Sequence, residues 1–148
     1  MKTLKLFTVV PLGLTISLLL THASLAEIPP LQINSSLKPD PLIVKGESGG
    51  SIASNCGNIS SQPSQVIQVT ESVPYLRLTV ETVETQGKPS LLVDGPGGRF
   101  CVLPDNYNGS KAEFSGYWQS GKYSIHVGEL SKIKYNYTLY ISQQKQPK

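Results

Sequence analysis

The fold is decided by residues 91–128, LLVDGPGGRFCVLPDNYNGSKAEFSGYWQSGKYSIHVG. Turn-forming residues cluster in two short segments, DGPGG at 94–98 and DNYNG at 105–109, and such clusters form tight turns. After these turns apolar and polar residues alternate, and a period of two indicates half-buried strands. In the last strand the alternation predicts opposite faces for two sets: Tyr123, Ile125 and Val127 inward, Ser124 and His126 outward.

The same pattern continues on both sides of this stretch. Residues 76–81 place three apolar side chains on one face and three polar ones on the other, and residues 135–142 repeat the pattern with tyrosine, leucine and isoleucine. Nowhere do apolar residues recur with a period of 3.6 over a window long enough for a helix. Short strands separated by Gly, Pro, Asn and Asp turns therefore predict an all-β sandwich or barrel.

The first 26 residues have the features of an export signal. A charged start, MKTLK, is followed by an apolar run and by the small residues Ser24 and Ala26. A retained membrane anchor is the alternative, but about 15 apolar residues rise only about 22 Å as a helix, short of the ~30 Å hydrocarbon core. We predict a cleaved signal peptide over 1–26, a secreted or periplasmic location and no stable membrane span after cleavage.

Removal of the signal also changes the charge of the protein. The full chain carries +3, and losing Lys2 and Lys5 leaves eleven basic residues against ten acidic ones. No run of basic residues interleaved with aromatic residues occurs, so we expect no nucleic-acid partner.

The rest of the chain divides into three parts. Residues 27–41, EIPPLQINSSLKPDP, contain four prolines and no periodicity, which predicts a flexible leader. Residues 42–142 are expected to form the single β-sandwich domain, and residues 143–148 a disordered tail.

Cys56 and Cys101 are the only cysteines. In an oxidising compartment such a pair most simply forms a disulfide. Free thiols and metal ligands are the alternatives, but two sulfurs and one histidine in the exported part make a poor zinc site.

Several short motifs together resemble the bacterial pre-peptidase C-terminal domain. They are LLVDGPGGRF, the polar loop at Asp105, Trp118, the strand SGKYSIHVG and the closing strand YNYTLYIS. The resemblance implies a non-catalytic, jelly-roll-like antiparallel β-sandwich. Members of that family are often appended to secreted hydrolases and sometimes bind Ca²⁺ or a polymeric substrate. We expect a free-standing example that also carries a Cys pair, which the family does not require.

The segment GESGG at 46–50 is similar to the nucleophile motif of serine hydrolases, with Ser48 in the central position. A serine nucleophile needs a base and an orienting acid, and His126 is the only histidine of the exported part. An all-β chain of this length lacks the parallel sheet and crossover helices in which the order Ser, Asp, His is found. We therefore predict a plain glycine turn, with a solvated surface role for His126. A small secreted serine hydrolase using Ser48 and His126 remains the alternative.

Two loops carry oxygen ligands suited to Ca²⁺. Asp94 lies in the first, and Asp105, Asn106 and Asn108 lie in the second. They form one site only if the two loops lie at the same end of the sandwich. No D-x-D-x-D-G spacing is present, and such residues commonly hydrogen-bond their own turns. Calcium is the one cofactor that the sequence suggests.

Aromatic residues are the remaining candidates for ligand binding. Tyr107, Tyr117, Trp118 and Tyr140 could stack on sugars or on a polymer, although packing at the edge of the sandwich is the competing role. Tyr117 and Trp118 are neighbours, so one of them must point inward. We predict an exported, non-catalytic module that binds a protein or polysaccharide partner, with a structural protein or an inhibitor of a hydrolase as further alternatives.

Overall fold

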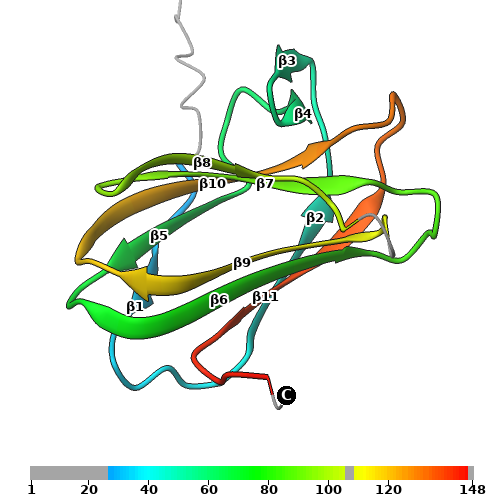
Figure 1. The fold of residues 1–148 in the computed structure, drawn as a ribbon. Coiled ribbons are helices and arrows are strands. Elements are labelled where there is room, and N and C mark those ends of the chain that lie inside the picture. Colours follow the sequence, from blue (N-terminus) through cyan, green and yellow to red (C-terminus); the bar gives the residue numbers. More distant parts are fainter. Residues whose placement is uncertain (1–26, 106–108, 147–148) are drawn as a thin grey trace, which may run out of the picture.

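The computed structural model describes residues 27–105 and 109–146. These residues form two β-sheets packed face to face (Figure 1), without a helix among them. No described segment is a helix long and apolar enough to cross a membrane. The predicted all-β sandwich, with mainly antiparallel strands and one disulfide, is confirmed. The predicted signal peptide lies outside the described residues.

The described residues contain eleven strands, which make up the two sheets. Those of the first sheet, sheet A, are β1 (Leu31–Ile33), β3 (Ile52–Ser54), β4 (Gly57–Ile59), β5 (Gln65–Val69), β7 (Pro89–Gly95), β8 (Gly98–Val102) and β10 (Gly121–Glu129). Those of the second, sheet B, are β2 (Leu42–Glu47), β6 (Val73–Thr82), β9 (Lys111–Trp118) and β11 (Asn136–Ser142).

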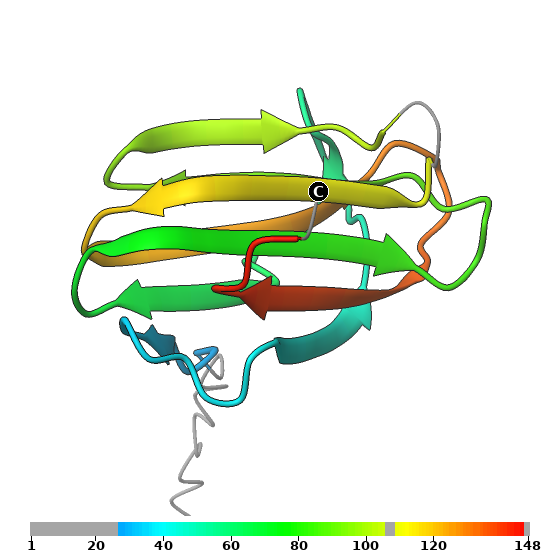
Figure 2. The same ribbon diagram turned by 60° about the horizontal axis from the view of Figure 1, so that its bottom comes forward.

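Strand β10 is the centre of sheet A. It pairs with β5 and β4 along one side and with β7 along the other, all antiparallel. Sheet B has the order β2-β11-β6-β9 and is antiparallel throughout. As a result β8, beside β7, and β9, beside β6, run along the same side of the sandwich (Figure 2).

The core lies between the sheets and follows the predicted alternation. Every second residue of β6, β10 and β11 is buried, as a period of two requires. The central ones are Leu76, Leu78, Val80, Tyr123, Ile125, Val127, Tyr137, Leu139 and Ile141.

The disulfide ties an outer element to sheet A. Cys56 lies in the turn between β3 and β4, and Cys101 lies on β8; their Cα atoms are 5.6 Å apart. The cystine packs with Ile59 and Leu92 in a second, smaller apolar cluster. This cluster covers part of the face of sheet A that is turned away from the core.

The leader prediction for residues 27–41 was wrong in part. Residues 31–33 form β1, which pairs in parallel with β5, and Ile33 is fully buried. Leu37 is also buried in the main core. Three strand residues are too few to show a periodicity, so the prolines dominated the sequence pattern.

The prediction of a disordered tail from residue 143 was also wrong where the structure describes it. The backbone N–H of Gln143 donates to Asp40 Oδ2 at 3.1 Å, and its side-chain Oε1 accepts from the backbone N–H of Leu37 at 3.2 Å. Gln143 Nε2 also donates to the carbonyl of Asn34. The end of β11 therefore holds the N-terminal segment in place. Residues 147–148 lie outside the described residues.

Truncating Ile33 tests whether the N-terminal segment belongs to the fold. Because its side chain is fully buried, we expect Ile33→Ala to lower the free energy of unfolding by about 2–5 kcal/mol. Urea denaturation measures this. Ile43→Ala, at a strand position that is 55% exposed, should stay within about 0.5 kcal/mol of the parent. Equal stability of the Ile33 variant and the parent would contradict the packed segment.

Candidate functional site

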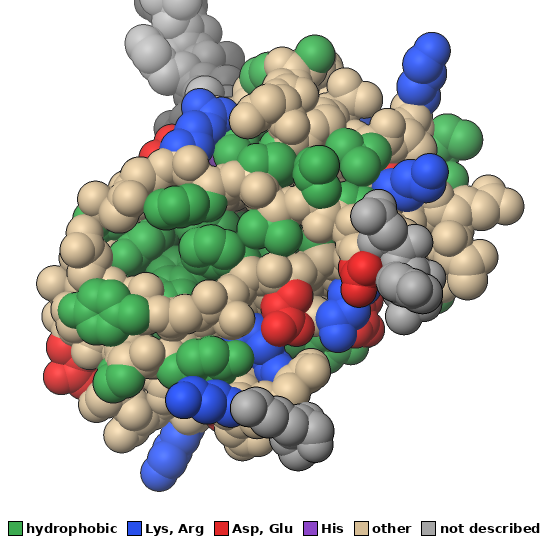
Figure 3. Space-filling view, in the orientation of Figure 1, with side chains coloured by type: hydrophobic (Ala, Val, Ile, Leu, Met, Phe, Trp, Pro, Cys, Tyr) green, Lys and Arg blue, Asp and Glu red, His purple; other side chains and the backbone are tan. Residues whose placement is uncertain are grey.

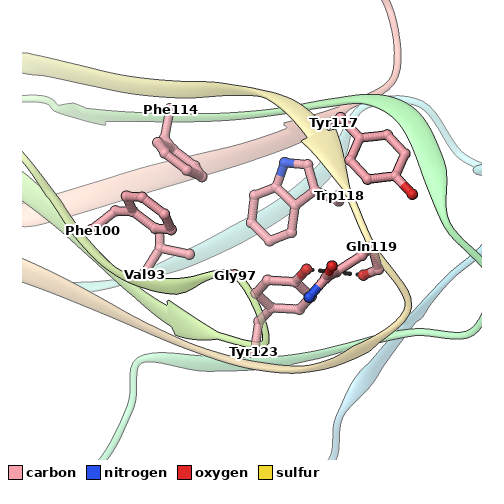
Figure 4. A pocket seen from close by; sticks show the side chains of 8 residues that line it. All are labelled: Val93, Gly97, Phe100, Phe114, Tyr117, Trp118, Gln119 and Tyr123. Carbon is pink, nitrogen blue, oxygen red and sulfur yellow. Dashed lines mark hydrogen bonds between the residues drawn. The ribbon is translucent and has the colours of Figure 1, made fainter.

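An aromatic cleft opens between the edge strands β8 and β9. It is a cavity of about 170 Å³, and hydrophobic side chains gather around it in a hollow of the surface (Figure 3). Its lining comes from β7, β8, β9, β10 and the adjoining turns (Figure 4): Val93, Gly97, Phe100, Phe114, Tyr117, Trp118, Gln119 and Tyr123.

A continuous row of aromatic rings runs across the cleft. Phe100 on β8 stacks on Phe114 on β9, with ring centroids 5.6 Å apart. Phe114 meets the edge of Trp118 at 5.6 Å, and Trp118 lies 4.6 Å from Tyr123 on β10. Such offset and edge-on contacts stabilise aromatic clusters beyond the area that they bury. The row therefore holds the two edges of the sandwich together.

The polar ends of the inner rings are already bonded. Trp118 Nε1 donates to the carbonyl of Leu76 at 3.1 Å, and the Tyr123 hydroxyl donates to the carbonyl of Gln119 at 2.9 Å. Burial raises the pKa of Tyr123, so its hydroxyl remains a donor at neutral pH. These two inner rings therefore offer their faces, rather than free donors, to the cleft.

The turn between β7 and β8 fits closely over Tyr123. A Cβ placed on Gly95 would lie 2.1 Å from Cδ1 of the Tyr123 ring, far inside van der Waals contact. The DGPGG segment is therefore more than a turn, because its first glycine makes room for a ring that lines the cleft.

Exposure separates the rim from the floor. Trp118 is only 2% exposed, whereas Phe100 is 44% and Tyr117 66% exposed. As expected, one of the neighbours Tyr117 and Trp118 points inward, and it is Trp118. A role for Trp118 as an open stacking platform is corrected accordingly: it forms the floor of the cleft.

The four predicted aromatic candidates do not form one site. Tyr117 and Trp118 both line the cleft, but Tyr140 lies on the outer face of sheet B, and Tyr107 lies outside the described residues. Sequence reasoning missed Phe100, Phe114 and Tyr123 as site residues. Their alternation marks them as strand residues, but only the approach of β8 to β9 brings them together.

The predicted calcium ligands also lie apart. Asp94 pairs with Arg99 beside the turn between β7 and β8, whereas Val102 at the other end of β8 leads to Asp105. The two loops are therefore at opposite ends of the strand, so the condition for a joint site is not met. Asn106 and Asn108 lie outside the described residues. In the parts that are described, no group of three or more His, Cys, Asp or Glu residues is placed to hold a metal ion.

Ser48 belongs to a buried polar cluster centred on Glu129. Ser48 is fully buried; its hydroxyl donates to Glu129 Oε2 at 3.0 Å and accepts from the backbone N–H of Tyr135 at 3.2 Å. Glu129 Oε1 accepts from the backbone N–H groups of Lys88 at 2.8 Å and Ser131 at 3.1 Å. The GESGG segment is thus a buried, hydrogen-bonded corner and not a plain turn. Ser48 faces a carboxylate instead of His126, and its side chain is closed off from the surface.

His126 lies on the outer face of sheet A, opposite Leu92. It is half-buried rather than fully solvated, and its Nδ1 is buried with no hydrogen-bond partner among the described residues. Burial lowers the pKa of His126, and Arg99 lowers it further, while a bond to Ser60 and the charge of Asp94 oppose the shift. The protonated form is therefore disfavoured in the folded state.

The Glu129 cluster gives a stability prediction. Glu129→Ala leaves three donors without their acceptor, and each should cost about 1–3 kcal/mol, so we expect a loss of about 3 kcal/mol or more in urea denaturation. Glu47→Ala changes an exposed carboxylate next to the same motif and should change stability by less than about 0.5 kcal/mol. Similar losses in both variants would show that the cluster has no special role.

His126 gives a prediction on pH. Its folded pKa is below its ordinary value near 6.5, so the unfolded chain binds more protons and stability rises with pH. The contribution is complete above pH 6.5 and is lost as the pH falls below it. We expect the urea midpoint to drop between pH 8 and pH 5.5, and to drop less in His126→Gln. An unchanged pH dependence in the variant would contradict this origin.

The fold is that of a known domain. The crystal structure of the pre-peptidase C-terminal domain of a collagenase from Bacillus anthracis matches 78% of this chain and 96% of that chain, with a TM-score of 0.51 and 12% sequence identity. The resemblance drawn from the sequence motifs is thereby confirmed at the level of the fold. No protein-family model matches the sequence.

A sequence relative comes from Synechococcus elongatus. It is the uncharacterized protein Synpcc7942_2126, which is 37% identical over 105 residues, a match that spans 68% of this chain and 75% of the relative. The chain belongs to the same family as this protein of Synechococcus elongatus and has the fold of a pre-peptidase C-terminal domain.

Proposed function

We propose that this chain is a non-catalytic module that binds a protein partner by taking an apolar side chain of that partner into the aromatic cleft. The observation that carries the proposal is the lining of the cleft, five aromatic rings with Gln119 as the one amide side chain. Its volume of about 170 Å³ is below the ~300–1,000 Å³ typical of small-molecule sites. The cleft therefore suits one side chain rather than a whole cofactor.

The two edge strands support a peptide as the occupant. Within the described residues β8 pairs with β7 alone and β9 with β6 alone, so each has one edge without a partner strand beside the cleft. At the far end of β9 the carbonyl of Lys111 accepts from the backbone N–H of Asp105. An extended segment can hydrogen-bond to such an edge while its alternate side chains enter the neighbouring pocket. A sugar unit, by contrast, needs several polar side chains around it, and this cleft does not provide them.

Two further observations support the non-catalytic part. Ser48, the residue on which the hydrolase alternative depends, is fully buried against Glu129. The collagenase structure that this fold matches is that of a pre-peptidase C-terminal domain, not of the peptidase itself. The predicted signal peptide and the disulfide between Cys56 and Cys101 support a location outside the cytoplasm, where such bonds persist.

The test is a search for peptide ligands with a reporter in the cleft. Peptides selected from a random heptapeptide phage library are titrated against the protein while the fluorescence of Trp118, the only tryptophan of the chain, is followed. We expect selected peptides to share an aliphatic or aromatic residue and to shift this emission. Phe100→Ala should lower the affinity of these peptides by about tenfold or more, as the loss of a contact in an interface hot spot does.

Ile43→Ala is the matched control, since it removes an exposed apolar side chain from the opposite edge strand of sheet B, β2. It should leave peptide affinity unchanged. The proposal fails if the selected peptides bind equally well to Phe100→Ala and to the parent, or if they lack an apolar residue altogether.

A further inference from the structure

A second hollow, which we call the Arg77 groove, lies on the outer face of sheet B. Its volume is about 270 Å³. Arg77 and Thr79 of β6 and Tyr140 and Ser142 of β11 line it, together with Gln144 and Gln146 of the C-terminal tail. Figure 2 shows this tail crossing in front of sheet B. The groove therefore lies on a different face from the aromatic cleft and does not depend on the function proposed for that cleft.

Strand register fixes how the groove residues lie. Arg77 is directly opposite Ser142, and Thr79 is directly opposite Tyr140. Arg77 and Tyr140 are thus diagonal neighbours across two strands, about 7–8 Å apart. Although all four side chains point away from the core, Thr79 is only 5% and Ser142 only 3% exposed. The floor of the groove is recessed, as a ligand site requires.

Arg77 is the one side chain of the groove whose charge is not balanced. Among the described residues its Nη1 is buried without a hydrogen-bond partner, and Arg77 takes part in none of the ion pairs found there. Lys111 and Glu81, the other charged residues of the lining, pair with each other at 3.8 Å, and Lys111 also lies 3.9 Å from Glu113. A buried guanidinium donor without an acceptor is costly, and a carboxylate matches its planar pair of N–H groups.

We propose that the Arg77 groove binds the carboxylate of an acidic sugar, a uronic acid unit of a polysaccharide. Arg77 holds the carboxylate, and the Tyr140 ring offers an apolar face to the C–H groups of the sugar. The side-chain amides of Gln144 and Gln146 supply the donors and acceptors that sugar hydroxyls need. The hydroxyl of Ser142 lies beneath them and accepts from the backbone N–H of Gln144 at 3.1 Å. An acidic peptide also carries carboxylates, but it has no flat face of C–H groups to pack on the ring of Tyr140 beside Arg77.

The experiment is calorimetric titration of the mature, oxidised protein at low salt with three probes: trigalacturonate, the neutral galactose trisaccharide and triglutamate. We expect trigalacturonate to bind about tenfold or more tightly than either of the others, the scale of one charged hydrogen-bond pair. Arg77→Gln should lower the affinity for trigalacturonate by a similar factor. Arg99→Gln removes the same charge from an exposed position on β8 and should change its affinity less than about twofold, as expected for an exposed charge outside the site.

Three outcomes overturn the proposal. They are no detectable binding of trigalacturonate, an equal loss in the Arg77 and Arg99 variants, and binding of triglutamate as tight as that of the sugar. Circular dichroism and thermal unfolding establish that Arg77→Gln is folded. If it is not, Arg77→Lys keeps the charge and loses the planar pair of donors, and it should still bind trigalacturonate more weakly than the parent. Full affinity in Arg77→Lys then overturns the assignment of Arg77.

Discussion

Backbone hydrogen bonding along β10 is the interaction on which the rest of the structure depends. This strand joins β5 and β4 on one side to β7 on the other, so nearly all of sheet A is assembled on it. Its inward residues fill the centre of the core, and its last residue, Glu129, organises the buried corner at Ser48. Because strand and corner share one segment, the packing of the two sheets and the polar cluster stabilise each other.

The aromatic cleft follows from how the sheets end. On the same side of the sandwich, sheet A ends in β8 and sheet B ends in β9, and each of these strands has a partner strand on one edge only. Apolar side chains between the two edges would be exposed to water if nothing covered them. The rings of Phe100, Phe114 and Trp118 cover this opening from both sheets. They cover it incompletely, since Phe100 stays 44% exposed. A hollow lined by large apolar groups on a surface of this size is a feature that binding proteins use. The Arg77 groove differs in kind, because its recessed floor is polar and its arginine is unpaired.

The sequence patterns predicted correctly those features of the fold that depend on residues close together in the chain. The alternation at Leu76, Leu78 and Val80 assigned β6 and both of its faces correctly, because a period of two is unambiguous in a long strand. The pairing of Cys56 with Cys101 followed from there being two cysteines. What depends on distant residues was not accessible. The role of Ser48 depends on its hydrogen bond to Glu129, 81 residues away. Turn composition located the loops of Asp94 and Asp105 but did not show that they lie at opposite ends of β8.

The attachment of the N-terminal segment to Gln143 has a consequence for how the chain folds. Strand β2 pairs with β11 alone among the described strands, and the segment before it is held by Gln143 through Asp40 and Leu37. Strand β2 thus finds its partner strand only when nearly the last residues of the domain have been made, whereas β1 can pair with β5 earlier. Contacts of such wide separation in sequence slow folding. Until β11 is made, residues 38–47 have no partner strand and must stay unaggregated, and the prolines and charges of this segment oppose its aggregation.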